Sequence, residues 1–302
     1  MNKESIFILD FLSGGIAGAF SKTIAAPLER VKLLLQTQSE NQALLRPYNG
    51  IADCFQRCVK EEGIPSLWRG NMVNIIRYFP SQALNFSFKE LYSKIFNFDS
   101  NQQMNQYILW QFMAGGLAGC SSKALIYPLD FARTRLGVDI GSNKKKRQFN
   151  GIIDCLTKVY KQDGLRGLYR GITVGLVGIF MYRSLYFGLY DWGKAVFLNQ
   201  NNSKENLLIK KYLFAQCVVV FSETISYPTD TLKRKMMMQS ARREKLYKNS
   251  IDCSIQLYKQ GGFKIFFSGN ASNIFRSFGS SLCLVVYDEI HSFFQEKNKQ
   301  YF

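Results

Sequence analysis

The chain has 302 residues, of which 47% are hydrophobic, and a formal net charge of +17. This length can bury a large core, and the charge indicates anionic partners such as nucleic acid, acidic lipid or phosphorylated metabolites. Lysines and arginines are spread along the chain and interleave with apolar stretches such as 282–287, which argues against a nucleic-acid-binding protein. The seven cysteines form no C-x-x-C pair and only one histidine is present, so we interpret the cysteines as reduced packing residues.

The first fifteen residues, MNKESIFILDFLSGG, lack the basic start, apolar middle and cleavage site of a secretory signal. They are not rich in arginine and serine, as a transit peptide would be. We therefore expect any targeting information to lie within the mature chain.

The next pattern is a long segment over about 6–37, a short amphipathic helix over 51–62 and a second long segment over 72–97. Each long segment exceeds the roughly 20 residues that cross a bilayer. Charges interrupt both segments, and polar residues in a spanning helix normally face a bundle interior or a watery cavity. The pattern predicts two membrane helices joined by a short surface helix.

The same unit recurs twice. PLERVK at 27–32 returns as PLDFAR at 128–133 and as PTDTLK at 228–233, a period of about 100 residues. Three such units predict six long helices in a pseudo-threefold bundle around a central cavity. A soluble helical repeat protein is the alternative. We expect one domain of three tandem repeats, over residues 1–100, 101–202 and 203–302.

The repeated motif places a proline inside each odd-numbered long helix. A proline removes a backbone hydrogen bond and kinks the helix, so the three helices can converge below the cavity. Beyond each proline, an acid and a base three positions apart share one helical face. They could form local pairs on a solvated helix, or ion pairs between repeats.

P-x-[DE]-x-x-[KR] three times in phase, each with a trailing aromatic-basic-Gly element, resembles the mitochondrial carrier family over essentially the whole chain. Within the family, RYFPSQALNFSFK at 77–89, YPLDFARTRL at 127–136 and MMMQS at 236–240 look like the ADP/ATP-carrier branch. The RRRMMM motif of that branch reads KRKMMM at 233–238. The resemblance implies an all-α membrane protein of the mitochondrial inner membrane that exchanges ADP for ATP by alternating access and is not an enzyme.

The resemblance also implies a matrix gate, a ring of ion pairs between repeats that closes the matrix side. The expected pairs are Glu29 with Arg133, Asp130 with Lys233, and Asp230 with Lys32, with Gln36 as a brace beneath one of them.

A cytosolic gate should close the opposite side. Ser93 stands where the family has a base in repeat one, and His291 stands there in repeat three, so we expect weak closing. The residues implied for this gate are Glu90, Asp191, Lys194, Asp288 and His291.

ADP and ATP carry several negative charges and one flat ring, so their site needs cations and an apolar slot. By resemblance, the cationic contacts are Lys22, Arg77 and Arg276, the base borders Gly178, Ile179, Tyr182 and Ser226, and Arg183, Asn85 and Lys89 lie nearby. The alternative is that the aromatic and aliphatic residues only pack and the arginines reach lipid head groups.

Two charges depart from the ADP/ATP-carrier pattern. The reference position in repeat one is Lys22, which lies seven residues, about two turns, before Glu29 and shares its helical face. The equivalent positions hold Lys123 and Glu223, where that branch has uncharged residues. A charge inside a membrane protein is costly unless it is paired or solvated. We consider three hypotheses: Lys123 pairs with Glu223, Glu223 pairs with Lys22, or both are kept wet by the cavity.

In the family, cardiolipin phosphates sit at helix N-termini near Gly and aromatic-basic-Gly elements, as expected for anions at positive helix ends. Asn249 and Ser268 in repeat three do not match, which leaves that site doubtful. The matching residues are Gly50, Ile51, Arg69 and Gly70 in repeat one and Gly151, Ile152, Arg170 and Gly171 in repeat two.

Two other functions stay open. The added charges would permit a different phosphorylated substrate. The weakened cytosolic gate would also suit a carrier-fold structural subunit that binds lipid within a larger inner-membrane complex and transports little or nothing. We expect no metal and no cofactor beyond bound cardiolipin.

Overall fold

The computed structural model describes residues 3–41, 43–96, 104–141, 147–197, 204–240, 242 and 245–279. Within these ranges every regular element is helical, as the sequence predicts. The first repeat contains α1 (Lys3–Thr37), η1 (Gln38–Glu40), α2 (Ile51–Glu62), η2 (Ile64–Trp68), α3 (Asn71–Ile76) and α4 (Tyr78–Ile95).

The later repeats follow the same plan. The second contains α5 (Met104–Gly137), α6 (Ile152–Leu168) and α7 (Ile172–Phe197). The third contains α8 (Lys204–Met238), α9 (Ser250–Gly261) and η4 (Gly262–Phe267), and the chain is helical again over 270–279. The predicted unit therefore recurs as far as the described residues reach. No helix in this part of the chain is both long and apolar enough to cross a membrane.

The segment predicted over 72–97 is divided into two helices that meet at Arg77. Pro80 has no N–H to donate to the carbonyl of Ile76, so an unbroken helix would lose a hydrogen bond there. The break leaves Arg77 at the junction, from which its side chain reaches Asp130 of α5.

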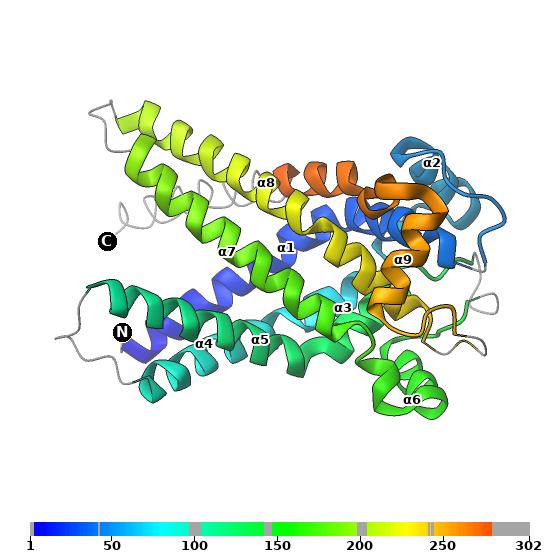
Figure 1. The fold of residues 1–302 in the computed structure, drawn as a ribbon, viewed down its shortest axis with the longest axis horizontal. Coiled ribbons are helices and arrows are strands. Elements are labelled where there is room, and N and C mark those ends of the chain that lie inside the picture. The colour runs from blue at the N-terminus through cyan, green and yellow to red at the C-terminus, as the bar shows by residue number, and fades with distance from the viewer. Residues whose placement is uncertain are drawn as a thin grey trace, which may run out of the picture.

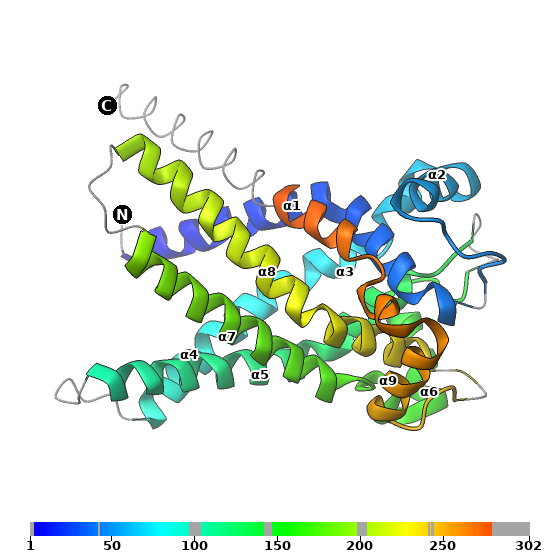
Figure 2. The ribbon, with the colours of Figure 1, turned by 45° about the horizontal axis from the view of Figure 1, so that its top comes forward.

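The long helices diverge at one end of the bundle and converge at the other, where α2, α6 and α9 lie; we call this the closed end (Figures 1 and 2). α4 packs along α5, and α7 packs along α8, so neighbouring repeats meet side by side. The ring is completed where the Ser272 hydroxyl donates to the carbonyl of Leu28 in α1, at 2.9 Å. The predicted prolines lie inside α1, α5 and α8, as Pro27, Pro128 and Pro228.

Three hydrophobic clusters fill the closed end, one for each repeat. Each contains a fully buried cysteine of the short helix, Cys54, Cys155 or Cys253. These thiols are free, so the interpretation of the three as packing residues is confirmed.

The three methionines at the end of α8 connect these clusters. Met236 packs in the cluster of repeat three, Met237 in that of repeat two and Met238 in that of repeat one. Successive residues of a helix point about 100° apart, so one turn of α8 can reach all three repeats. The methionines of the KRKMMM stretch therefore pack against all three repeats at the closed end.

Glycines allow adjacent repeats to approach closely. Gly70, Gly171 and Gly269 have left-handed φ values of 80°, 85° and 83°. A Cβ on them would lie 3.0, 2.9 and 3.0 Å from the carbonyl oxygens of Arg133, Lys233 and Lys32, respectively. Each glycine therefore packs against the backbone of a predicted gate base in another repeat. A side chain at the glycine would push the two repeats apart.

Replacing Gly269 should destabilise the protein more than replacing Gly262. Both have positive φ, 83° and 61°, so Ala at either costs about 1–3 kcal/mol in backbone strain. Only at Gly269 would the new methyl meet Lys32, because nothing lies within 4 Å of a Cβ at Gly262. Thermal unfolding of the purified Gly269→Ala and Gly262→Ala variants measures the difference. Equal losses would contradict the close approach.

Candidate functional site

A cavity of about 370 Å³ lies between the helices above the closed end. Small-molecule sites commonly have volumes of roughly 300–1,000 Å³. Three of the predicted substrate residues, Arg183, Asn85 and Lys89, do not line this cavity. The Arg183 guanidinium donates to the carbonyl of Gly115 at 3.1 Å. The other predicted substrate residues do line it, namely Lys22, Arg77, Gly178, Ile179, Tyr182, Ser226 and Arg276.

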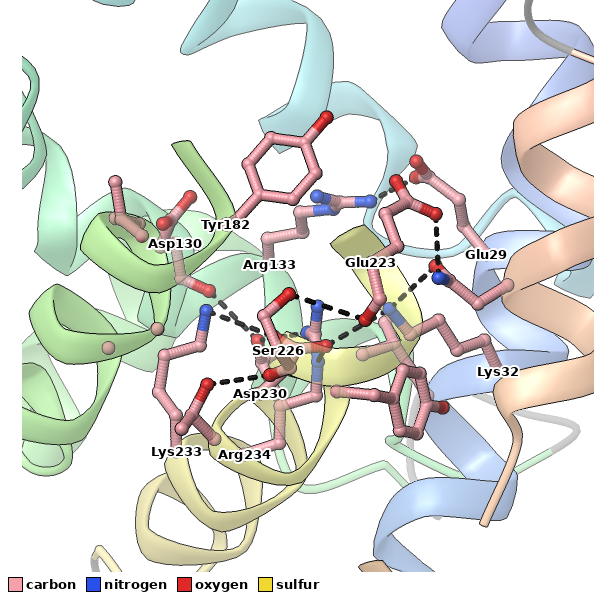
Figure 3. A pocket seen from close by; sticks show the side chains of 18 of the residues that line it. Glu29, Lys32, Asp130, Arg133, Tyr182, Glu223, Ser226, Asp230, Lys233 and Arg234 are labelled. Carbon is pink, nitrogen blue, oxygen red and sulfur yellow. Dashed lines mark hydrogen bonds and ion pairs between the residues drawn. The ribbon is translucent and has the colours of Figure 1, made fainter. Parts of the chain in front are cut away.

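Two of the three predicted matrix-gate pairs form the floor of this cavity, as Figure 3 shows. Arg133 of α5 contacts Glu29 of α1. Lys32 Nζ of α1 lies 3.0 Å from Asp230 Oδ2 of α8. These ion pairs between repeats are confirmed.

The predicted brace at Gln36 also lies where expected. Its amide nitrogen donates to Thr231 Oγ1 at 3.1 Å and to Asp230 Oδ2 at 3.4 Å. Gln36 is 1% exposed, so it closes the floor beneath the pair of Lys32 with Asp230.

The third predicted pair, Asp130 with Lys233, is wrong. Lys233 Nζ lies 3.2 Å from Asp230 Oδ1 within its own helix. The Asp130 carboxylate is instead held by Arg77 on one oxygen and by Lys123 on the other. Lys123 precedes Asp130 by about two turns on the same face, so it takes the place that Lys233 would have filled.

The two pairings considered for the added charges are wrong as well. Lys123 is bound to Asp130, and Glu223 Oε1 lies 2.8 Å from Arg276 Nη2. No acid of the described residues forms an ion pair with Lys22, and its ammonium lies 5.3 Å from the centre of the Tyr78 ring. Among these residues, Lys22 is therefore the one predicted cationic contact that no acid holds.

Sequence reasoning missed two asparagines at this site, of which Asn273 lines the cavity and Asn74 is buried beside it. Asn74 and Asn273 each precede a predicted contact arginine by three residues and accept hydrogen bonds from it, at 3.1–3.3 Å. The amide nitrogen of Asn74 donates to Glu29 at 3.1 Å, and that of Asn273 donates to Glu223 at 2.8 Å. The spacing N-x-x-R in repeats one and three is a signal that could have revealed them.

Repeat two has glycines at the equivalent positions, Gly175 and Gly178. A Cβ on Gly178 would lie 2.3 Å from Thr229 Oγ1 of α8. The missing side chains thus allow α7 to approach α8 and leave the α7 wall of the cavity without a cation of its own, although Lys233 of α8 packs against Gly175. Tyr182 and Ile179 line this wall, which makes it the apolar side of the site.

The predicted cytosolic gate is described only in repeat one. Glu90 lies 2.7 Å from Lys94, one turn away in α4, and both side chains are exposed. In the described part of the chain, Lys94 therefore pairs within its own helix and forms no ion pair with another repeat. The side chains of Asp191 and Lys194, and all of Asp288 and His291, lie outside the described residues.

The predicted lipid sites differ in their helix ends. Gly50 and Gly151 stand at the N-caps of α2 and α6, with no side chain to cap the helix. In repeat three the Asn249 side chain accepts from the N–H of Asp252 at 2.8 Å. An anion at the start of α9 would have to displace this cap, whereas α2 and α6 leave their first N–H groups to an outside acceptor.

The arginines predicted at these sites are already engaged. Arg69 contacts Glu62 and donates to the carbonyls of Asp139 and Gly141 at 2.9 and 2.7 Å. Arg170 donates to the carbonyl of Gln239 at 3.4 Å. A role of Arg69 as a lipid contact would therefore require several internal bonds to break.

The cavity lining carries an excess of positive charge. Eight cations and four acids line it, which leaves a formal excess of four charges. All four acids accept from at least one of these cations. The cavity can attract an anion, but an anion must compete with internal carboxylates for most of the cations.

The family model described as mitochondrial carrier protein matches residues 3–100, 105–201 and 204–298, one match for each repeat. The chain belongs to the mitochondrial carrier family. Carriers of this family are transporters, so the carrier is not an enzyme.

Curated relatives agree over nearly the whole carrier. It is 46% identical to ADP/ATP translocase 3 of Bos taurus over 297 residues, which covers 96% of this chain and 99% of the relative. The identity to ADP/ATP translocase 3 of Homo sapiens is also 46% over 297 residues, with the same coverage. A mitochondrial substrate carrier family protein, ancA, of Dictyostelium discoideum is 47% identical over 292 residues, 96% of this chain and 94% of the relative.

The unequal bonding of Asp130 predicts unequal effects of mutation. Asp130→Asn leaves Arg77 and Lys123 facing each other without their shared anion, which should cost about 3 kcal/mol. Lys123→Gln leaves Arg77 on Asp130 and frees the acid for Lys233, so it should cost about 1 kcal/mol or less. Thermal unfolding of both purified variants gives the order. A larger loss for Lys123→Gln would contradict the assignment.

Proposed function

We propose that this carrier exchanges ADP for ATP across the mitochondrial inner membrane by alternating access. The observation that carries the proposal is one cavity that combines three contact cations, an apolar wall and a floor of ion pairs between repeats. The names of the relatives at 46% identity support adenine nucleotides as the substrate.

The charges suit a nucleotide that enters from the open end. Lys22 is held by no acid of the described residues and can receive a phosphate first. Arg77 and Arg276 then exchange their internal carboxylates for phosphate oxygens, which offer guanidinium groups the bidentate geometry they favour. The adenine ring lies against Ile179 and Tyr182 on the α7 wall.

Opening on the matrix side requires the floor to separate. The pairs of Glu29 with Arg133 and of Lys32 with Asp230 join different repeats, so both must break for the nucleotide to leave. Substrate can shift this equilibrium only if it binds the open or intermediate state more tightly than the closed one. Exchange of phosphate for carboxylate on the cavity cations supplies that difference.

Bound cardiolipin is part of the proposal. The uncapped N-termini of α2 and α6 suit lipid phosphates, whereas the cap at Asn249 disfavours a third site. We assign the lipid contacts to backbone N–H groups near Gly50, Ile51, Gly151 and Ile152.

A carrier-fold structural subunit is the second candidate. Its support is that Asp130 and Glu223 already occupy two of the three contact cations. A subunit of a larger inner-membrane complex could keep such a cavity closed. Stable co-purification with a respiratory assembly in mild detergent would favour this function, and a different phosphorylated substrate would appear as exchange of that compound.

The test is uptake of labelled ADP by cardiolipin-containing liposomes that hold the purified carrier, with and without internal ATP. The proposal expects uptake that requires internal nucleotide. Folded protein that takes up no nucleotide would overturn it and favour the structural subunit.

Lys22→Gln should reduce kcat/KM for exchange by about 10-fold or more, because a hydrogen bond to a charged group contributes about 1.5–3 kcal/mol. The change removes the ion-pair partner of no acid in the described part of the chain, so the thermal unfolding temperature should stay near that of the parent. Lys60→Gln on the exposed face of α2 is the control and should exchange normally. Equal exchange by Lys22→Gln and Lys60→Gln would remove Lys22 from the site.

A further inference from the structure

Glu223 is an acid of the cavity that lies outside the P-x-[DE]-x-x-[KR] motifs. It lies in α8, seven residues before Asp230, with its side chain 20% exposed. Its two carboxylate oxygens have different partners on the helix at 270–279: Oε1 lies 2.8 Å from Arg276 Nη2, and Oε2 accepts from Asn273 Nδ2 at 2.8 Å.

A continuous set of contacts leads from this acid to the floor of the cavity. Asn273 Oδ1 accepts from Lys32 Nζ at 2.9 Å. The same ammonium lies 3.0 Å from Asp230 Oδ2, in the ion pair that joins repeats one and three (Figure 3). One asparagine thus separates Glu223 from a base of the matrix gate.

The other repeats do not have this arrangement. In repeat one, Asn74 donates directly to the gate acid Glu29, and the position equivalent to Glu223 is Lys22. In repeat two, Gly175 replaces the asparagine and Lys123 replaces the acid. Among the described residues, an additional acid therefore stands between a contact arginine and the gate only in repeat three.

We infer that Glu223 is a positioning residue that couples occupancy of Arg276 to the ion pair of Lys32 with Asp230. The inference rests on the proposed function. An anion that takes Arg276 removes the cation from Glu223, and an acid left unpaired in a partly buried site is costly. The cation that Asn273 links to Glu223 is Lys32, so Glu223 competes with Asp230 for it and weakens the gate.

This arrangement also selects the substrate. An anion must displace a carboxylate that lies 2.8 Å from the guanidinium. A ligand that offers Arg276 no more than another single carboxylate gains little from the exchange, whereas a di- or triphosphate gains charge and a bidentate contact. Glu223 therefore lowers the affinity for substrate and raises the fraction of binding events that open the gate.

Glu223→Gln keeps the shape of the side chain and removes its charge. The inference expects tighter binding and slower turnover, with KM and kcat for ADP/ATP exchange both reduced about 10-fold, which corresponds to about 1.4 kcal/mol each. Glu223→Asp, which retains the charge, should recover part of kcat. Glu61→Gln on α2, with a half-exposed side chain, is the matched control and should change neither constant. An unchanged or higher kcat in Glu223→Gln would overturn the inference.

A double-mutant cycle tests the route. In a Lys32→Gln background the gate cation is gone, so Glu223→Gln should have little further effect on kcat. Additive effects of the two changes would show that Glu223 acts without Lys32 and would overturn the proposed coupling.

A measurement without transport separates this inference from the proposed function. Gln36 is 1% exposed beneath the gate, so a cysteine introduced by Gln36→Cys should react slowly with a small thiol reagent. Peptide mass spectrometry reads labelling at this position with ATP or inorganic pyrophosphate added.

The anion should increase this labelling several-fold when Glu223 is present and not in the Glu223→Gln variant. Equal labelling in both proteins, or no increase with Glu223 present, overturns the coupling. If the carrier exchanges no nucleotide but the labelling still depends on Glu223, the proposed function fails and the coupling stands.

Discussion

The close approach of the three repeats at the closed end is the constraint on which the other features depend. Three glycines each pack against the backbone carbonyl of a gate base in another repeat, namely Gly70, Gly171 and Gly269. Ion pairs between repeats require side-chain groups to meet within about 3–4 Å, so the helices that carry them cannot be held apart by side chains at these contacts. The same closeness lets the three successive methionines of α8 pack in all three hydrophobic clusters.

Above this floor, the cationic side chains of the cavity are held by other groups of the protein. Arg77 is held by Asp130 and Arg276 by Glu223, while Lys22 lies against an aromatic ring. Pairing lowers the cost of keeping so many cations in a partly buried space. An anion that binds Arg77 or Arg276 must therefore displace an internal carboxylate.

The pseudo-threefold arrangement is therefore regular in the backbone and irregular in its charges. Positions 22, 123 and 223 are equivalent in sequence, yet Lys22 lies against an aromatic ring, Lys123 binds the acid of its own repeat and Glu223 binds an arginine. The ring has two ion pairs between repeats through its predicted partners, because Lys123 has replaced Lys233 at Asp130. The boundary between repeats two and three is joined instead by the packing of Gly171 and Met237 and by polar contacts, such as that of Arg135 with the carbonyl of Met238 at 2.8 Å.

The sequence by itself determined the repeats, the all-helical plan, two of the gate pairs and most of the cavity lining. A motif that recurs in phase must occupy equivalent places in each repeat, which fixes the repeats and the helical plan, while the gate pairs and the cavity lining came from the resemblance to the mitochondrial carrier family. The tertiary structure alone decided which acid each cavity cation takes, as at Lys123, Glu223 and Asn273. Several partners lie within the reach of each long side chain, and only the distances between helices from different repeats choose among them.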